Sequence, residues 1–144
     1  MEISLYNMSN KYRPNNISKE EFTNAIKKMA DEVWEFHNRF KVGSGRFADE
    51  SPTEIIKMRK KILDEEFMEL NQALDNDEDE LSIADEVSDI LFVAMGHIES
   101  MGDFGISSIE NVTKKNSLKT IETHKLREDT GKILPIKGKP HKWK

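Results

Sequence analysis

The 144-residue chain contains no cysteine, which excludes a disulfide framework and a metal site built from thiolates. It also has no long hydrophobic run. The longest, "ILFVAM" at 90–95, is far shorter than the roughly 20 apolar residues that span a bilayer. The first residues, "MEISLYNMSNKYRPNN", show no charged head, apolar middle and small-residue cleavage site of a secretory signal. These absences predict a cytoplasmic protein with no membrane partner.

Positive charge is also in short supply. The net charge is −5, which counts against a protein that coats a nucleic acid polymer by attraction to its phosphates. Charged residues make up 34% of the chain and hydrophobic residues 36%, a balance typical of a globular protein. A chain of this length buries about two-thirds of the surface that its unfolded form exposes. We therefore expect one domain over residues 1–144.

Four helices are predicted from hydrophobic spacing and from signals at their ends, over 18–40, 51–74, 81–100 and 107–125. Three of them begin with a serine followed three residues later by a glutamate, as in a capping box. These pairs are Ser18 with Glu21, Ser51 with Glu54, and Ser107 with Glu110. The connections are short, which favours antiparallel neighbours. The predicted fold is an all-α antiparallel four-helix bundle over 18–125, with an N-terminal extension over 1–17 and a basic irregular tail over 126–144.

Two glutamates interrupt the apolar stripe of the second predicted helix. Ile62, Glu66, Glu69 and Ala73 follow the spacing of three and four residues that places side chains on one helical face. Two negative charges on a buried face repel each other and lose hydration. A positive partner is therefore expected between Glu66 and Glu69.

The third predicted helix contains a second acidic pair, Glu86 and Asp89, in a segment that is otherwise almost entirely apolar. If the two helices pack antiparallel, the four acids can converge. Carboxylate oxygens without cysteine or histidine suit Mg²⁺, or Mn²⁺, which commonly anchors substrate phosphates. Glu65, one residue round the helix, could reach a second ion or orient a water molecule.

Two other interpretations of the acids remain open. The glutamates at 65, 66 and 69 could form a solvated face paired with Lys60, Lys61 or Arg59. Alternatively, the chain could be a non-enzymatic calcium-binding helical module, because four acids fall at positions 1, 3, 5 and 12 of a calcium-loop pattern. These acids are Asp75, Asp77, Asp79 and Glu86. Glu80 stands where that loop needs glycine, however, and a left-handed non-glycine residue costs about 1–2 kcal/mol.

The acidic pattern resembles that of the all-α nucleoside triphosphate pyrophosphohydrolases, the MazG-like group. Their signature of E-E-x-x-E followed by E-x-x-D is present as "EEFME" at 65–69 and "EVSD" at 86–89. The segment "VWEFHNRF" is similar to the family's aromatic first helix, and "KKNSLKT" to its later N-x-x-K element, through Asn116 and Lys119. The resemblance spans roughly residues 22–135.

The resemblance implies Mg²⁺ binding by Glu66, Glu69, Glu86 and Asp89, with Glu65 near a further ion or the attacking water. It implies cleavage of a nucleoside triphosphate between the α and β phosphates, in a homodimer or homotetramer with sites often built across subunits. A role in clearing unwanted nucleotides would fit such an enzyme. Phosphoribosyl-ATP pyrophosphohydrolase is a near neighbour that the acidic motif does not separate, and a structural dimerisation bundle is the remaining alternative.

Substrate contacts are expected from two further groups of residues. Lys115 and Lys119 could cover phosphate charge that the metal ions leave exposed, and Asn116 accompanies them through the resemblance. Aromatic side chains of the first predicted helix could stack on a base. Trp34 and His37 are the favoured candidates for the base pocket, whereas Phe36 and Phe40 are expected in the core.

Overall fold

The computed structural model describes residues 16–42 and 50–138, which form four helices and one short hairpin. The helices are α2 (Lys19–Phe40), α3 (Pro52–Asp75), α4 (Glu80–Ser100) and α5 (Asp103–Ser117). The strands are β1 (His124–Leu126) and β2 (Ile133–Pro135), which pair antiparallel. The all-α prediction is confirmed. None of the helices in the described ranges is long and apolar enough to cross a membrane.

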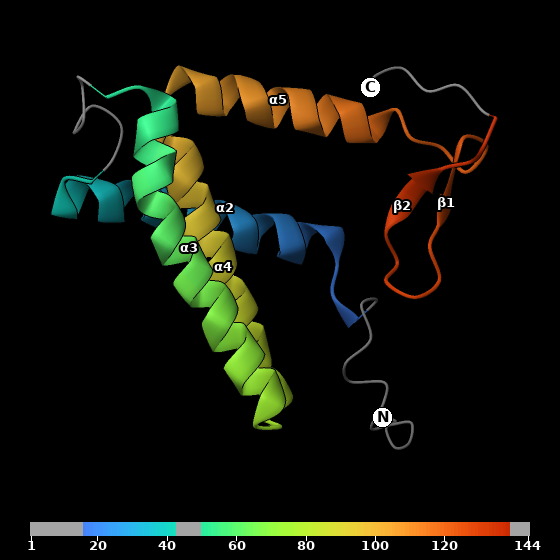
Figure 1. Ribbon diagram of the computed structural model, residues 1–144, viewed down its shortest axis with the longest axis horizontal. Helices are drawn as coiled ribbons and strands as arrows, with labels where there is room; N and C mark the ends of the chain where they lie inside the picture. Colours follow the sequence, from blue (N-terminus) through green and yellow to red (C-terminus); the bar gives the residue numbers. More distant parts are fainter. Residues whose placement is uncertain (1–15, 43–49, 139–144) are drawn as a thin grey trace.

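Helix α4 is the centre of the fold, because α2, α3 and α5 each pack against it. Helices α3 and α4 run side by side in opposite directions, and α2 crosses this pair (Figure 1). The turn between α3 and α4 is only a few residues long, which enforces their antiparallel packing. Helix α5 leads away from the pair toward the hairpin (Figure 1).

The predicted starts of α2 and α3 are confirmed. The Ser18 side chain accepts a hydrogen bond from the backbone N–H of Glu21, and the Glu21 side chain accepts one from the backbone N–H of Ser18, which completes a capping box. Ser51 caps α3 through the backbone N–H of Glu54. The sequence predicts that Gly43 and Gly45 end the first helix, but both lie outside the described residues. Helix α2 ends at Phe40, where Lys41 adopts a left-handed conformation with φ 57°.

The predicted fourth helix, over 107–125, has both ends wrong. Gly102 adopts φ 62° and ψ −132°, so the chain turns sharply after α4 and α5 already begins at Asp103. Ser107 therefore lies inside α5 and does not cap it. The helix ends at Ser117, whose hydroxyl donates to the backbone oxygen of Lys114. Side chains that bond to nearby backbone compete with helix continuation.

The irregular tail predicted over 126–144 is partly ordered. Gly131, with φ 78°, lets the chain reverse, and its backbone N–H donates to the backbone oxygen of Arg127. The reversal allows Leu126 to pair with Ile133 in the hairpin. Residues 139–144 and the first part of the predicted N-terminal extension, 1–15, lie outside the described residues.

Candidate metal and substrate site

The acidic motifs of α3 and α4 meet, as the sequence predicts. One carboxylate oxygen from each of Glu66, Glu86 and Asp89 lies within 4.8 Å of the other two. The antiparallel register brings this about. Glu66 faces Asp89, while Arg59, seven residues earlier in α3, approaches Gly96, seven residues later in α4.

Two of these carboxylates each hold an oxygen that is buried and unpaired. Among the described residues, Glu66 Oε1 and Glu86 Oε1 have no hydrogen-bond partner. Burial raises the pKa of Glu66, and the negative charges of Glu69 and Asp89 raise it further. Burial likewise raises the pKa of Glu86, with a further increase from Glu69 and Asp89. Glu69 is exposed, but its charge acts on both buried acids, so it lies beside the cluster.

The donor set suits a divalent cation. Three carboxylate oxygens gather within the span of a single coordination sphere, and all are hard oxygen ligands of the kind that Mg²⁺ and Mn²⁺ prefer. Buried oxygens without a partner are costly unless they bind something positive. No basic side chain forms an ion pair with these acids in the described ranges. Glu65 is exposed on α3 and is not among the three clustered carboxylates.

The structure disagrees with the two alternative interpretations of the acids. A solvated face would pair the glutamates with Lys60, Lys61 or Arg59. Lys60 pairs with Asp64 instead, and Arg59 is only 9% exposed and donates to His97. Lys61 forms no ion pair with these glutamates in the described ranges. In a calcium loop, the residue at the position of Glu80 is still part of the loop that surrounds the ion. In this chain, α4 already begins at Glu80. Asp79 caps α4 by accepting from the backbone N–H of Ser82, which lowers the pKa of Asp79. Glu86 belongs to the cluster with Glu66, so the loop lacks its last ligand.

A cavity of about 390 Å³ begins at the acid cluster and extends between α2, α3 and α4. Glu66 and the exposed Asp89 line it together with two buried residues, His37 and Arg59. Its walls are mostly apolar. They are Phe36, Phe40, Val42, Ile62, Phe92 and Val93. The expectation that Phe36 and Phe40 belong to the core is wrong, because both line the cavity and Phe40 is 59% exposed.

Buried polar residues form the inner end of this cavity. His37 Nδ1 lies 2.6 Å from Glu99 Oε1, and both side chains are largely buried. Arg59 Nε donates to His97 Nδ1 at 3.3 Å. Burial lowers the pKa of Arg59, partly opposed by the charge of Glu99, and burial together with Arg59 lowers the pKa of His97. His97 is therefore neutral and can accept the Arg59 hydrogen bond.

Arg59 is the site residue that the sequence reading missed. Helical spacing predicts that the stripe of Ile62 continues back to Met58. Met58 is 49% exposed, however, whereas the buried face of α3 runs through Ile55 and Arg59. Helical spacing could have identified Arg59 as part of this face, because it follows Ile55 by four residues and precedes Glu66 by seven. A charged residue in a buried stripe indicates a functional site, as Glu66 and Glu69 do.

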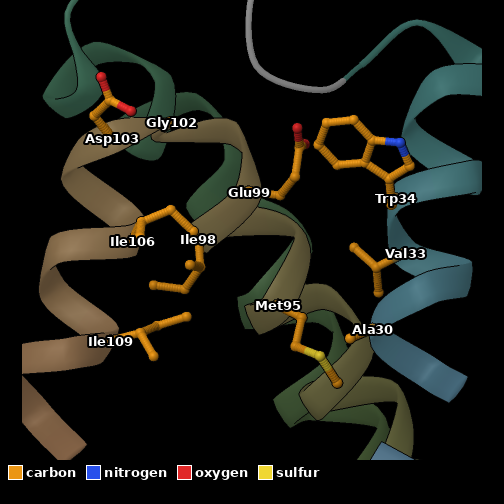
Figure 2. A pocket seen from close by; sticks show the side chains of 10 residues that line it. All are labelled: Ala30, Val33, Trp34, Met95, Ile98, Glu99, Gly102, Asp103, Ile106 and Ile109. Carbon is orange, nitrogen blue, oxygen red and sulfur yellow. The ribbon is translucent and has the colours of Figure 1, made fainter. Parts of the chain in front are cut away.

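Trp34 lies apart from the acids. It lines a separate cavity of about 390 Å³ formed by α2, α4 and the start of α5. Figure 2 shows Trp34 and Val33 of α2 facing Met95 and Glu99 of α4, with Ile106 on the α5 side. Within one chain, His37 reaches the cavity that contains the acids and Trp34 does not.

The basic candidates also lie apart from the acids within one chain. Asn116 and Lys119 line a third cavity, of about 480 Å³, between the end of α5 and the hairpin. The Asn116 side chain donates to the backbone oxygen of Val112. Lys115 lies one residue before Asn116, in the last turn of α5. Figure 1 shows the end of α5 well away from the α3–α4 pair.

Comparison with known proteins identifies the family. The profile of the phosphoribosyl-ATP pyrophosphohydrolase family, PRA-PH, matches residues 33–116. No curated protein matches the chain significantly, and no solved structure does. The matched range contains the whole acid cluster and the inner end of its cavity. The chain therefore belongs to the phosphoribosyl-ATP pyrophosphohydrolase family of the MazG-like all-α superfamily, and its chemistry is that of a pyrophosphohydrolase.

Proposed function

We propose that this chain is a Mg²⁺-dependent nucleoside triphosphate pyrophosphohydrolase that cleaves between the α and β phosphates. The observation that carries the proposal is the convergence of Glu66, Glu86 and Asp89 from two helices, with two buried oxygens left unpaired. The products are a nucleoside monophosphate and pyrophosphate. Removal of unwanted nucleotides is the biological role that such an activity would serve.

Each acidic residue has a distinct part in the proposed site. Glu66, Glu86 and Asp89 would hold the ion through the three clustered oxygens, and Glu69 would add a fourth carboxylate at the exposed edge. Glu65 lies on the solvent side, where it orients the attacking water or contacts a second ion. Bound Mg²⁺, or Mn²⁺ in its place, supplies charge neutralisation for the phosphates and lowers the pKa of a bound water.

Phosphoribosyl-ATP is the second candidate substrate, because the matching family is named for its hydrolysis. It carries the same triphosphate but bears a second ribose phosphate on its base. The extra group would need room beside His37 and Arg59, the two buried residues that line the cavity. Because both side chains are buried, we favour an ordinary nucleoside triphosphate.

A panel assay of pyrophosphate release tests the proposed function. Canonical ribo- and deoxyribonucleoside triphosphates and phosphoribosyl-ATP are compared with Mg²⁺, with Mn²⁺ and with a chelator. We expect metal-dependent pyrophosphate release from at least one nucleoside triphosphate. Turnover of phosphoribosyl-ATP alone would replace the first candidate by the second, and calcium binding without turnover of any substrate would contradict both.

Substitution of the acids tests the ligand assignment. Asp89→Ala and Glu69→Ala should each lower kcat/KM at least about 100-fold, because loss of even an outer-shell partner of a metal costs about 10–100-fold. Asp64→Asn is the matched control. Asp64 is an exposed acid of the same helix, paired with Lys60 at 2.9 Å, so its loss should leave turnover unchanged. Full activity in both alanine variants would refute the assignment.

A further inference from the structure

We propose that Arg59 and His37 recognise the base of the substrate and select one that presents a carbonyl oxygen beside a ring N–H. Guanine, uracil and thymine have such an edge. This inference rests on the proposed function, because it assumes that the phosphates bind at the acid cluster. It assigns base selection to two buried side chains on different helices.

The position of Arg59 relative to the acids supports this assignment. Arg59 and Glu66 are seven residues apart on one face of α3, which corresponds to about 10.5 Å along a helix. Both line the same cavity, Glu66 toward the open acidic end and Arg59 in the buried part. A nucleotide held by its phosphates at the acids extends its sugar and base into this cavity, toward Arg59.

Arg59 is anchored in a way that leaves donors for a ligand. Its Nε donates to His97 Nδ1, and this is its only hydrogen bond with the residues that the structure describes. A guanidinium group has further N–H donors on its terminal nitrogens and no acceptor. Arg59 is also 9% exposed and lines the cavity. Arg59 therefore presents hydrogen-bond donors at the inner end of the cavity, where water has little access.

His37 supplies the complementary acceptor. Glu99 lies 2.6 Å from His37 Nδ1, and a carboxylate accepts, so the proton is on Nδ1. In the tautomer with its proton on Nδ1, Nε2 is left as an acceptor. Gly96 leaves room for both groups: a Cβ on residue 96 would lie 2.7 Å from His37 Nε2 and 3.0 Å from Arg59 Nη2. The donor and the acceptor thus both approach α4 at a residue that has no side chain.

This pair matches one type of base edge. A carbonyl oxygen accepts from Arg59, while the adjacent ring N–H donates to His37 Nε2. Adenine and cytosine have an amino group in place of that carbonyl, and an amino group cannot accept from Arg59. Phe36, Phe40 and Phe92 offer ring faces on the cavity wall, but stacking is tolerant of base identity. Selectivity among the bases therefore depends on Arg59 and His37.

The experiment compares two readouts across four nucleotides. One is kcat/KM with Mg²⁺ for dGTP, dUTP, dATP and dCTP. The other is calorimetric binding of the corresponding α,β-imido analogues with Mg²⁺, which does not depend on turnover. We expect dGTP and dUTP to exceed dATP and dCTP at least tenfold in both. Equal values for the wild-type protein, or a preference for the amino bases, would overturn the inference without any variant.

Variants separate base recognition from a merely structural role. Arg59→Met keeps an unbranched side chain of similar length but removes the donors, and should bring the ratio between the two classes of base close to one. Gly96→Ala, which crowds both polar groups, should reduce the same ratio. Arg127→Met is the matched control, because Arg127 is exposed, paired with Asp129 at 2.9 Å, and does not line this cavity. An unchanged ratio in folded Arg59→Met protein would overturn the inference.

The two proposals can fail separately. If no triphosphate is hydrolysed but the imido analogues bind with Arg59-dependent base selectivity, the proposed function is wrong and the inference stands. If hydrolysis occurs with no base selectivity, the inference is wrong and the proposed function stands. If the analogues do not bind, the inference is wrong.

Discussion

At the scale of single residues, the acid cluster lowers the stability of the metal-free protein. Glu66 and Glu86 lose hydration on folding and repel neighbouring carboxylates, and the pKa of each is raised above its ordinary value of 4.5. Such a group stabilises the fold when protonated. That stability is fully present below pH 4.5 and is lost as the pH rises through the raised pKa. At neutral pH, the charged cluster therefore destabilises the metal-free protein.

Removing one charge from the cluster should relieve this destabilisation. In a chelating buffer at pH 7, Glu66→Gln should raise the Tm by a few degrees, since about 1 kcal/mol corresponds to about 4 °C in a domain of this size. The gain should shrink as the pH falls below the raised pKa, where the wild-type side chain is itself protonated. Thermal melts between pH 4 and pH 8 measure it.

The same variant should respond less to metal. Mg²⁺ at 100 times its Kd stabilises a folded protein by about 2.7 kcal/mol, so the wild type should gain Tm on addition of Mg²⁺ and Glu66→Gln should gain less. A Glu66→Gln protein that melts below the wild type in chelator at pH 7 would contradict the electrostatic account.

At the scale of elements, a serine caps a helix only where the chain enters the helix at that residue. Ser51 occupies that position in α3, whereas Ser107 lies in the second turn of α5. Ser51→Ala should lower the free energy of unfolding by about 1 kcal/mol. Ser107→Ala should change it by less than about 0.5 kcal/mol. Urea unfolding of the two variants checks the contrast, and equal losses would contradict the observed start of α5.

Helices α4 and α5 pack closely because residue 105 has no side chain. A Cβ at Gly105 would lie 2.1 Å from the backbone oxygen of Ile98, and rigid backbone cannot move aside cheaply. Gly105→Ala should destabilise the protein by about 1–3 kcal/mol, although alanine is the better helix former by about 1 kcal/mol. Chemical denaturation measures whether the free energy of unfolding falls or rises in the variant. A stabilised Gly105→Ala protein would show that α4 and α5 do not pack as described.

At the scale of the whole molecule, much apolar surface stays uncovered in one chain. The buried hydrophobic residues in the described ranges are Val33, Ile55 and Ala73, whereas Phe104 is 68% exposed. Large apolar patches on a single chain mark interaction surfaces. We propose that a second copy of the chain covers the apolar face of α5, giving a homodimer or homotetramer. We further propose that the basic end of one chain's α5 reaches the acid cluster of another in this assembly.

Mixing two inactive variants tests both parts of this proposal. If Lys119 of one chain serves the acids of another, Glu69→Ala and Lys119→Ala proteins should recover activity when refolded together, up to about a quarter of the wild-type value for one intact site in four combinations. Light scattering should give a mass of at least two chains. A monomer at micromolar concentration, or no recovery in a mixed oligomer, would contradict a shared site.

The sequence by itself determined the all-α class, the starts of α2 and α3 and the acidic motif, because capping and helical spacing act over three or four residues. Tertiary structure alone decided that Arg59 lines the cavity of the acids, that Trp34 lines a different cavity, and that α5 begins at Asp103 instead of Ser107. These outcomes depend on which faces of distant helices meet. A pattern within one helix gives the directions of its side chains but not their partners, since packing energy belongs to pairs of elements.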